Sequence, residues 1–228
     1  MLSSSSSSST ADGLPAPAVT EFVAVDVFLL RRFALGLPLA IAIAEVARIA
    51  PFRHLCTRGG VMSVAMTNCG SWGWHSDARG YRYVERDPGS GQPWPHMPAV
   101  FHSLAVRAAA QCGFNGYEPD CCLGNRYAVG ARMGTHRDFD ELDMAHPIVS
   151  VSIGLPATFL WYGARRGGTP RQVLLEHGDV LVWGASARAG YHAVRRVADP
   201  LPSWLEPDAA TALGGDTVRY NLTFRRAR

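Results

Sequence analysis

The first half of the chain carries two segments in which apolar residues recur at helical spacing. Leu37–Ala50 has an alanine-rich apolar face, and Met97–Cys112 repeats this pattern before Gly113 ends it. Both segments predict α-helices. Phe22–Arg32, ahead of the first helix, has the pattern of an extended segment.

The second half of the chain consists of short apolar runs between turn signals. Short β-rich runs at this spacing are typical of the strands of a sandwich or barrel. The pattern therefore predicts a mainly β fold with flanking helices. The predicted strands are Cys121–Tyr127, Ile148–Leu155, Thr158–Tyr162, Gln172–Glu176, Val180–Trp183, Tyr191–Val197 and Thr217–Arg225.

Other segments lack such periodicity. Seven serines at Ser3–Ser9 cannot bury enough apolar surface to order the chain, so we expect a disordered tail over residues 1–17. A strand at Val61–Thr67 leads into Gly70–Pro98, which is rich in Gly, Pro, Trp and Tyr and indicates a surface lid. Pro200–Gly215 indicates a long loop. Residues 18–228 then form one predicted domain, with the lid at about 57–98 and the catalytic core at about 120–226.

Composition narrows the protein class. No apolar run reaches the roughly 18 residues of a membrane span, and the N-terminus lacks the pattern of a secretion signal. Five cysteines without a C-x-x-C pair indicate reduced thiols in an intracellular protein rather than a zinc site. We therefore expect a cytoplasmic protein without membrane contact, and a monomer.

All 22 basic residues are arginines, and the formal net charge is +3. The absence of lysine excludes Schiff-base chemistry and a P-loop lysine. Six arginines lie between Arg165 and Arg196 against two acidic residues. This segment is either a solvated surface or a rim that faces phosphates.

The motif His136-Arg137-Asp138 could hold a metal, because residues i and i+2 of a strand point to one face. With His192 from a later predicted strand, it supplies the two histidines and one carboxylate of non-haem iron oxygenases. A second H-x-D, His177-Gly178-Asp179, competes with it. Its central glycine and its place between two apolar runs favour a hairpin turn instead.

The predicted C-terminal strand has a polar and an apolar face. Alternation places Arg219, Asn221, Thr223 and Arg225 together on the polar face. That face is either an exposed edge or a barrel interior, where buried arginines require an anion. A dicarboxylate co-substrate would meet this need. Asn125 and Tyr127 share a face of another predicted strand and could hydrogen-bond the same acid, unless they only cap a strand end.

Taken together, these motifs resemble the AlkB family of alkylation-repair dioxygenases. The resemblance covers roughly Phe22–Arg226, and several blocks occur in the family's order and spacing. The blocks are Met62–Gly70, Asn125–Glu141, Pro147–Phe159, Leu174–Gly184, the pair Tyr191-His192, and Arg219–Arg225.

The resemblance implies a double-stranded β-helix (jelly roll) with an N-terminal nucleotide-recognition lid. It assigns Fe(II) to His136, Asp138 and His192, with O2 as co-substrate. It also assigns two larger sets of residues. The 2-oxoglutarate residues are Asn125, Tyr127, Arg219, Asn221 and Arg225, and the substrate residues are Trp74, Tyr81, Asp140 and Arg166.

The implied activity is oxidative removal of N-alkyl groups from bases such as 1-methyladenine and 3-methylcytosine. The expected partner is alkylated single-stranded DNA, with RNA as a second class. Two alternatives are a 2-oxoglutarate-dependent hydroxylase of a protein or small molecule, and a non-catalytic nucleic-acid-binding module. Val61, Arg137 and Phe139 depart from the family pattern. These departures leave the contacts with the nucleic-acid strand open, but they do not affect the iron chemistry.

Overall fold

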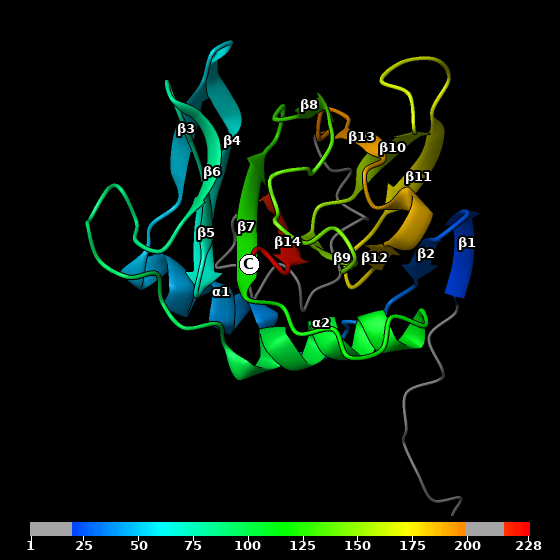
Figure 1. The fold of residues 1–228 in the computed structure, drawn as a ribbon, viewed down its shortest axis with the longest axis horizontal. Helices are drawn as coiled ribbons and strands as arrows, with labels where there is room; N and C mark the ends of the chain where they lie inside the picture. The colour runs from blue at the N-terminus through cyan, green and yellow to red at the C-terminus, as the bar shows by residue number, and fades with distance from the viewer. Residues whose placement is uncertain (1–19, 199–216) are drawn as a thin grey trace, which may run out of the picture.

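The computed structural model describes residues 20–198 and 217–228, and the predicted tail and the predicted loop Pro200–Gly215 lie outside them. A large antiparallel sheet forms the centre of the fold (Figure 1). Its strand order is β1-β2-β12-β9-β14-β7-β4-β3. In that order the strands are Thr20–Ala24, Val27–Leu30, Val180–Trp183, Ile148–Gly154, Val218–Arg225, Cys121–Ala128, Gly60–Gly70 and Arg53–Thr57.

A second sheet of four strands faces the large one, in the order β11-β10-β13-β8. Every strand pair in both sheets is antiparallel, as the jelly-roll prediction requires. The short strands place their inward side chains between the two sheets. They are β11 (Arg171–Leu175), β10 (Ala157–Gly163), β13 (Tyr191–Val194) and β8 (Met133–His136).

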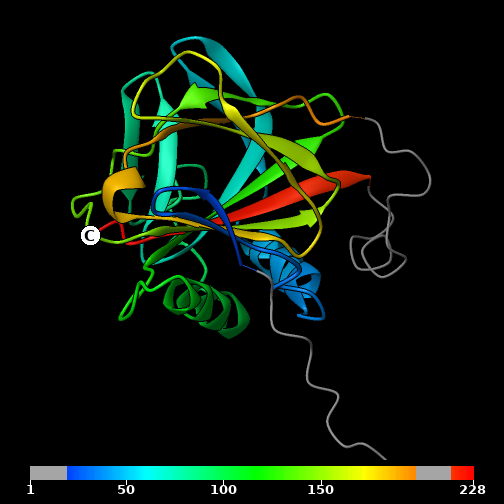
Figure 2. The same ribbon diagram turned by 90° about the vertical axis from the view of Figure 1, so that its right-hand side faces the viewer.

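Both predicted helices form, as α1 (Leu39–Ile49) and α2 (Ala99–Gln111). They cover one face of the large sheet (Figure 2). Val149, Val151 and Ile153 of β9 pack against them in one apolar core, whereas Ser150 and Ser152 point between the sheets. This alternation explains how one sheet supports a hydrophobic core and a polar site on opposite faces.

The predicted lid is more ordered than its composition indicated. Gly70–Pro98 was predicted without regular structure, but it contains a hairpin of β5 (Gly73–Asp77) and β6 (Gly80–Val84). Gly80 has φ +100°, which only glycine adopts readily, and Asp77 pairs with Arg82 across the turn. The extended segment at the N-terminus is likewise a hairpin, of β1 and β2.

Neither α-helix in residues 20–198 and 217–228 has the length and apolar composition needed to cross a bilayer. The five cysteines are all unpaired. Within the described part of the chain they contribute to no group of potential metal ligands, and the reduced state of the thiols stays a prediction.

Candidate active site

A cavity of about 340 Å³ lies between the two sheets, below the β5–β6 hairpin. Strands β7, β9 and β14 of the large sheet form its floor, and β8, β10 and β13 form the opposite wall. Eleven of the twelve predicted site residues line it; the twelfth, Arg166, does not. The eleven are Trp74, Tyr81, Asn125, Tyr127, His136, Asp138, Asp140, His192, Arg219, Asn221 and Arg225, of which Arg225 was predicted for two roles.

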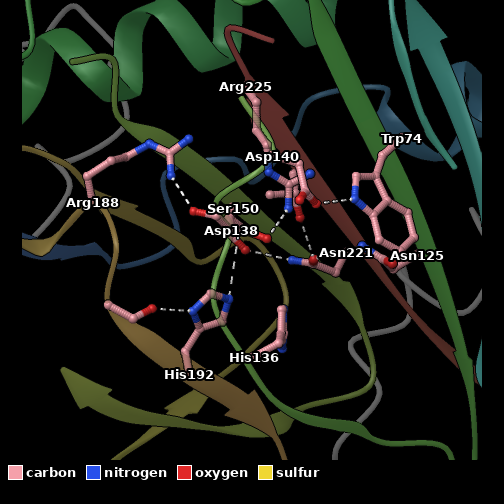
Figure 3. Close-up of polar contacts among 12 residues, drawn as sticks. Trp74, Asn125, His136, Asp138, Asp140, Ser150, Arg188, His192, Asn221 and Arg225 are labelled. Atoms are coloured by element: carbon pink, nitrogen blue, oxygen red, sulfur yellow. Dashed lines mark hydrogen bonds and ion pairs between the residues drawn. The ribbon is translucent and has the colours of Figure 1, made fainter. Parts of the chain in front are cut away.

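The three predicted metal ligands converge in this cavity. His136 lies opposite His192 in the β8–β13 register, and their ring centroids are 4.3 Å apart. Asp138 Oδ2 lies 3.8 Å from His192 Nε2. One ligand atom from each of the three residues falls within 4.8 Å of the others, and Figure 3 shows them around a common centre.

Both imidazoles are oriented by backbone carbonyls. His136 Nδ1 donates to Gly134 O at 2.8 Å, and His192 Nδ1 donates to Gly190 O at 3.0 Å. The proton is thereby held on Nδ1, which leaves the Nε2 lone pair free for a metal. Burial, together with the nearby His136, lowers the pKa of His192 to about 4, so its ring is neutral at pH 7.

The carboxyl group of Asp138 is ionised and can bind a cation. Burial would raise its pKa, but Arg225 and the two histidines outweigh burial and hold the pKa well below the usual range. Its Oδ1 accepts from Arg225 Nη2 at 3.0 Å, whereas the buried Oδ2 has no hydrogen-bond partner. An orphaned carboxylate oxygen between two free imidazole nitrogens fits a divalent metal such as Fe(II).

Asp138 does not lie on the strand that was predicted to carry it. We predicted that one strand would carry His136 and Asp138 on the same face. Strand β8 ends at His136, and Asp138 lies in the irregular segment that follows. Its position is set by the ion pair with Arg225 rather than by strand alternation.

The polar face of β14 points into the cavity, so the interior alternative is confirmed for this strand. Arg219 is buried and donates to Ser152 Oγ at 2.9 Å and to Leu155 O at 3.4 Å. Among the described residues no carboxylate lies within ion-pair distance of it, and its Nε has no partner. Burial lowers the pKa of Arg219 to about 10, so it stays cationic at pH 7.

The residues around Arg219 extend this polar slot. Asn221 Nδ2 donates to Ser150 Oγ at 2.8 Å, and Asn125 Oδ1 is buried without a partner. Burial raises the pKa of Tyr127 to about 12, which keeps its hydroxyl protonated. A buried cation and a hydroxyl donor beside the triad fit a small dicarboxylate. Sequence reasoning missed Ser150, although strand alternation in Ile148–Leu155 could have identified it.

Comparison with known proteins agrees with this chemistry. The sequence model of a family described as the 2OG-Fe(II) oxygenase superfamily matches residues 39–225. The alpha-ketoglutarate-dependent dioxygenase AlkB of Escherichia coli is 46% identical over 210 residues, which cover 91% of this chain and 93% of that protein. This chain belongs to the AlkB family. It is an Fe(II)- and 2-oxoglutarate-dependent dioxygenase, with O2 as co-substrate.

Two further relatives support the AlkB assignment. The DNA N(6)-methyladenine demethylase ALKBH1C of Arabidopsis thaliana is 32% identical over 165 residues, covering 64% of this chain and 35% of that protein. The structure of OsALKBH1 superposes with a TM-score of 0.77 at 25% identity, covering 91% of this chain and all of that one. The jelly-roll fold predicted from the resemblance is therefore confirmed.

The four substrate residues predicted from the AlkB resemblance are not all together. Trp74 stacks on Tyr81 with ring centroids 5.3 Å apart, and its Nε1 donates to Asp140 Oδ2 at 3.0 Å. These three side chains form one edge of the cavity. Arg166 lies outside the cavity wall on the exposed surface, where it reaches Thr135 O at 3.5 Å.

A buried ionic network behind the AlkB-type triad was not predicted. The Glu141 carboxylate lies between Arg188 and Arg225, with Oε2 3.1 Å from Arg188 Nη2 and Oε1 3.2 Å from Arg225 Nε. Tyr83 of the hairpin donates its hydroxyl to Glu141 Oε1 at 2.6 Å. Glu141 follows the metal motif by a few residues and could have been noticed, but no sequence signal marked Arg188 or Tyr83.

The segment Arg165–Arg196 fits neither prediction as a whole. Arg188 is 3% exposed and belongs to the buried network, whereas Arg165, Arg166, Arg195 and Arg196 lie on the surface. The second H-x-D is a turn, but the predicted hairpin is wrong, because the flanking strands β11 and β12 belong to different sheets. Gly178 has φ +84°, and the buried Asp179 pairs with Arg31 at 2.7 Å.

Proposed function

We propose that this dioxygenase removes N-alkyl groups from damaged nucleic-acid bases. The substrates proposed are 1-methyladenine- and 3-methylcytosine-type lesions in single-stranded DNA, with RNA as a second class, and the biological role is repair of alkylation damage. One observation carries the proposal: the triad shares its cavity with an aromatic pair and a carboxylate that suit a flat, cationic base. The demethylase activity in the name of the Arabidopsis relative points the same way.

In the proposed reaction, His136, Asp138 and His192 hold Fe(II). With 2-oxoglutarate and O2, the bound ion would supply oxidising chemistry in which one oxygen atom ends on the N-alkyl carbon and the other in succinate, with release of CO2. Arg219 binds the far carboxylate of 2-oxoglutarate, and Arg225 steadies the end nearer the metal through Asp138. The other 2-oxoglutarate residues are Asn125, Tyr127 and Asn221.

The hydroxyalkyl group then leaves as an aldehyde when its C–N bond breaks, and the base nitrogen keeps the electron pair. Because this change removes the positive charge of the lesion, a nearby anion distinguishes substrate from product. Asp140 lies at the cavity edge and can supply that anion. Its contact with Trp74 also fixes the ring on which the base would stack, as base–aromatic stacking requires.

The lesion must leave its base stack to reach the cavity floor. Unstacking costs a few kcal/mol in a duplex and less in a single strand, so single-stranded substrates are favoured. The two sheets and the hairpin enclose the reacting carbon and exclude bulk water from it.

A panel of methylated oligonucleotides tests the proposal. We expect formaldehyde and succinate in equal amounts from methylated single-stranded DNA, and none from His136→Ala. Turnover only with a methylated peptide or free nucleoside would favour the alternative hydroxylase. Binding of single strands without 2-oxoglutarate turnover would favour the non-catalytic module. The monomer and the cytoplasmic location remain predictions from the sequence, and light scattering tests the first.

A further inference from the structure

A further aromatic side chain lies at the rim of the cavity, on the segment that carries His136 and Asp138, next to the cavity-lining Arg137. Phe139 stands between the cavity-lining residues Asp138 and Asp140, yet its own side chain is 54% exposed and does not line the cavity. Consecutive Cα atoms are about 3.8 Å apart, so this ring is anchored at the very rim of the opening. A single exposed aromatic is common on protein surfaces, and other features must show whether it has a role.

The ring of Phe139 is held in place by a cation. The guanidinium carbon of Arg137 lies 4.4 Å from the Phe139 ring centroid and 5.3 Å from that of Tyr191. Arg137 therefore sits between two rings, one on each of two neighbouring segments. This arrangement reduces the motion of an otherwise exposed side chain, since cation–π contacts contribute about 0.5–1 kcal/mol at exposed sites.

The charge of Arg137 is not neutralised by an acidic side chain of the described residues. Among residues 20–198 and 217–228, Arg137 has no hydrogen bond or ion pair, and its contacts are with the two rings. Two other exposed arginines of this region are engaged by backbone carbonyls instead: Arg166 with Thr135 O and Arg196 with Gly130 O. An unpaired guanidinium beside an exposed aromatic ring combines the two contacts that single-stranded nucleic acid offers, a phosphate and a base face.

We propose that Phe139 and Arg137 form a second nucleobase site, which binds the nucleotide next to the lesion in the same strand. Phe139 stacks on the neighbouring base, and Arg137 contacts its phosphate. A base in the cavity carries its neighbours to the rim by covalent linkage, and Phe139 is anchored there. The inference rests on the proposed function, and it explains how the enzyme would prefer a strand to a free nucleotide.

The test compares Phe139→Ala with the wild type on strands that have a normal nucleotide or an abasic site beside a 1-methyladenine. On the normal strand we expect KM to rise about 5- to 150-fold, the range of one lost stacking contact, with kcat unchanged. With the abasic site on the contacted side, the wild type should already show the higher KM, and Phe139→Ala should add nothing. Phe139→Trp should restore the wild-type KM.

Two controls separate stacking from a structural effect. Leu142→Ala removes a neighbouring side chain that is 76% exposed and not aromatic, and it should leave KM unchanged. The free nucleotide 1-methyl-dAMP should show the same KM with wild type and Phe139→Ala. Equal losses on normal and abasic strands, or a loss on the free nucleotide, would overturn the proposal.

Binding provides a readout that does not depend on turnover. Fluorescence anisotropy with the same labelled strands should show the same dependence of Kd on Phe139 and the abasic site. For Arg137→Gln, the slope of log Kd against log salt concentration should fall by about 0.7, the value for one phosphate contact in single strands. If Kd depends on Phe139 and on the abasic site as expected but no formaldehyde is released, the proposed function fails while the second base site stands.

Discussion

Replacing Glu141 with glutamine should destabilise the fold although it changes almost no volume. The Glu141 side chain is 1% exposed and Arg188 is 3% exposed, and each is the other's ion-pair partner. Glutamine keeps an oxygen for the Tyr83 hydroxyl but removes the charge between Arg188 and Arg225. Arg225 retains Asp138, whereas Arg188 is left with carbonyl partners only.

Breaking a buried ion pair by removing one partner costs about 3–5 kcal/mol, because the remaining charge stays buried without compensation. Since Arg188 keeps its hydrogen bonds to carbonyls, we expect the lower end, about 3 kcal/mol, for Glu141→Gln. For a chain of this size each kcal/mol corresponds to about 2–4 °C, so the melting temperature should fall by about 6–12 °C.

Urea unfolding of the metal-free protein, followed by tryptophan fluorescence, measures this loss. The matched control is Asp77→Asn, which breaks the surface pair of Asp77 with Arg82 and should leave the midpoint unchanged because solvent screens that pair. A Glu141→Gln midpoint as close to wild type as that of Asp77→Asn would refute the reasoning. It would mean that water or local rearrangement compensates Arg188.

Three other outcomes are expected. Mn(II) at 100 times its Kd should raise the free energy of unfolding by about 2.7 kcal/mol, and calorimetry should show that His136→Ala loses most of this gain. Arg219→Lys should raise the KM for 2-oxoglutarate about 10- to 100-fold in a succinate assay, because lysine cannot reproduce the guanidinium contacts; an unchanged KM would contradict the role of Arg219. Because burial lowers the pKa of His192 from 6.5 to about 4, the unfolded chain binds a proton between these values that the fold does not. Metal-free protein should therefore be most stable above about pH 6.5 and lose stability as the pH falls toward 4, with a smaller loss in His192→Asn; a flat urea midpoint from pH 7 to 5 would exclude this linkage.

Local periodicity accounts for the part of the site that could be predicted. On β14, alternation placed Arg219 and Asn221 on one face, and the structure buries that face. The types of the triad residues and the turn at His177-Gly178-Asp179 were also readable, because they depend on neighbours in sequence. The resemblance to known sequences supplied the pairing of His136 with His192 that spacing alone left open.

The lid shows where such reasoning stops. Gly70–Pro98 has few periodic apolar residues, so its hairpin was missed. That hairpin is stabilised by contacts with distant segments, such as Trp74 with Asp140 and Tyr83 with Glu141. A composition rich in Gly, Pro and aromatic residues identifies an exposed segment but not the partners that order it.

By itself the sequence determined which side chains share a strand face and which chemistry those side chains can perform. Only the tertiary structure decided that Asp138 reaches the metal site from beyond a strand end, and that Arg188, Glu141, Arg225 and Tyr83 meet in one buried network. The reason is physical: side-chain direction along a strand repeats with the backbone, whereas an ion pair depends on how two segments that are remote in sequence pack against each other. The sequence shows that Arg188 is charged, but only the fold shows that Glu141 is the anion that makes its burial possible.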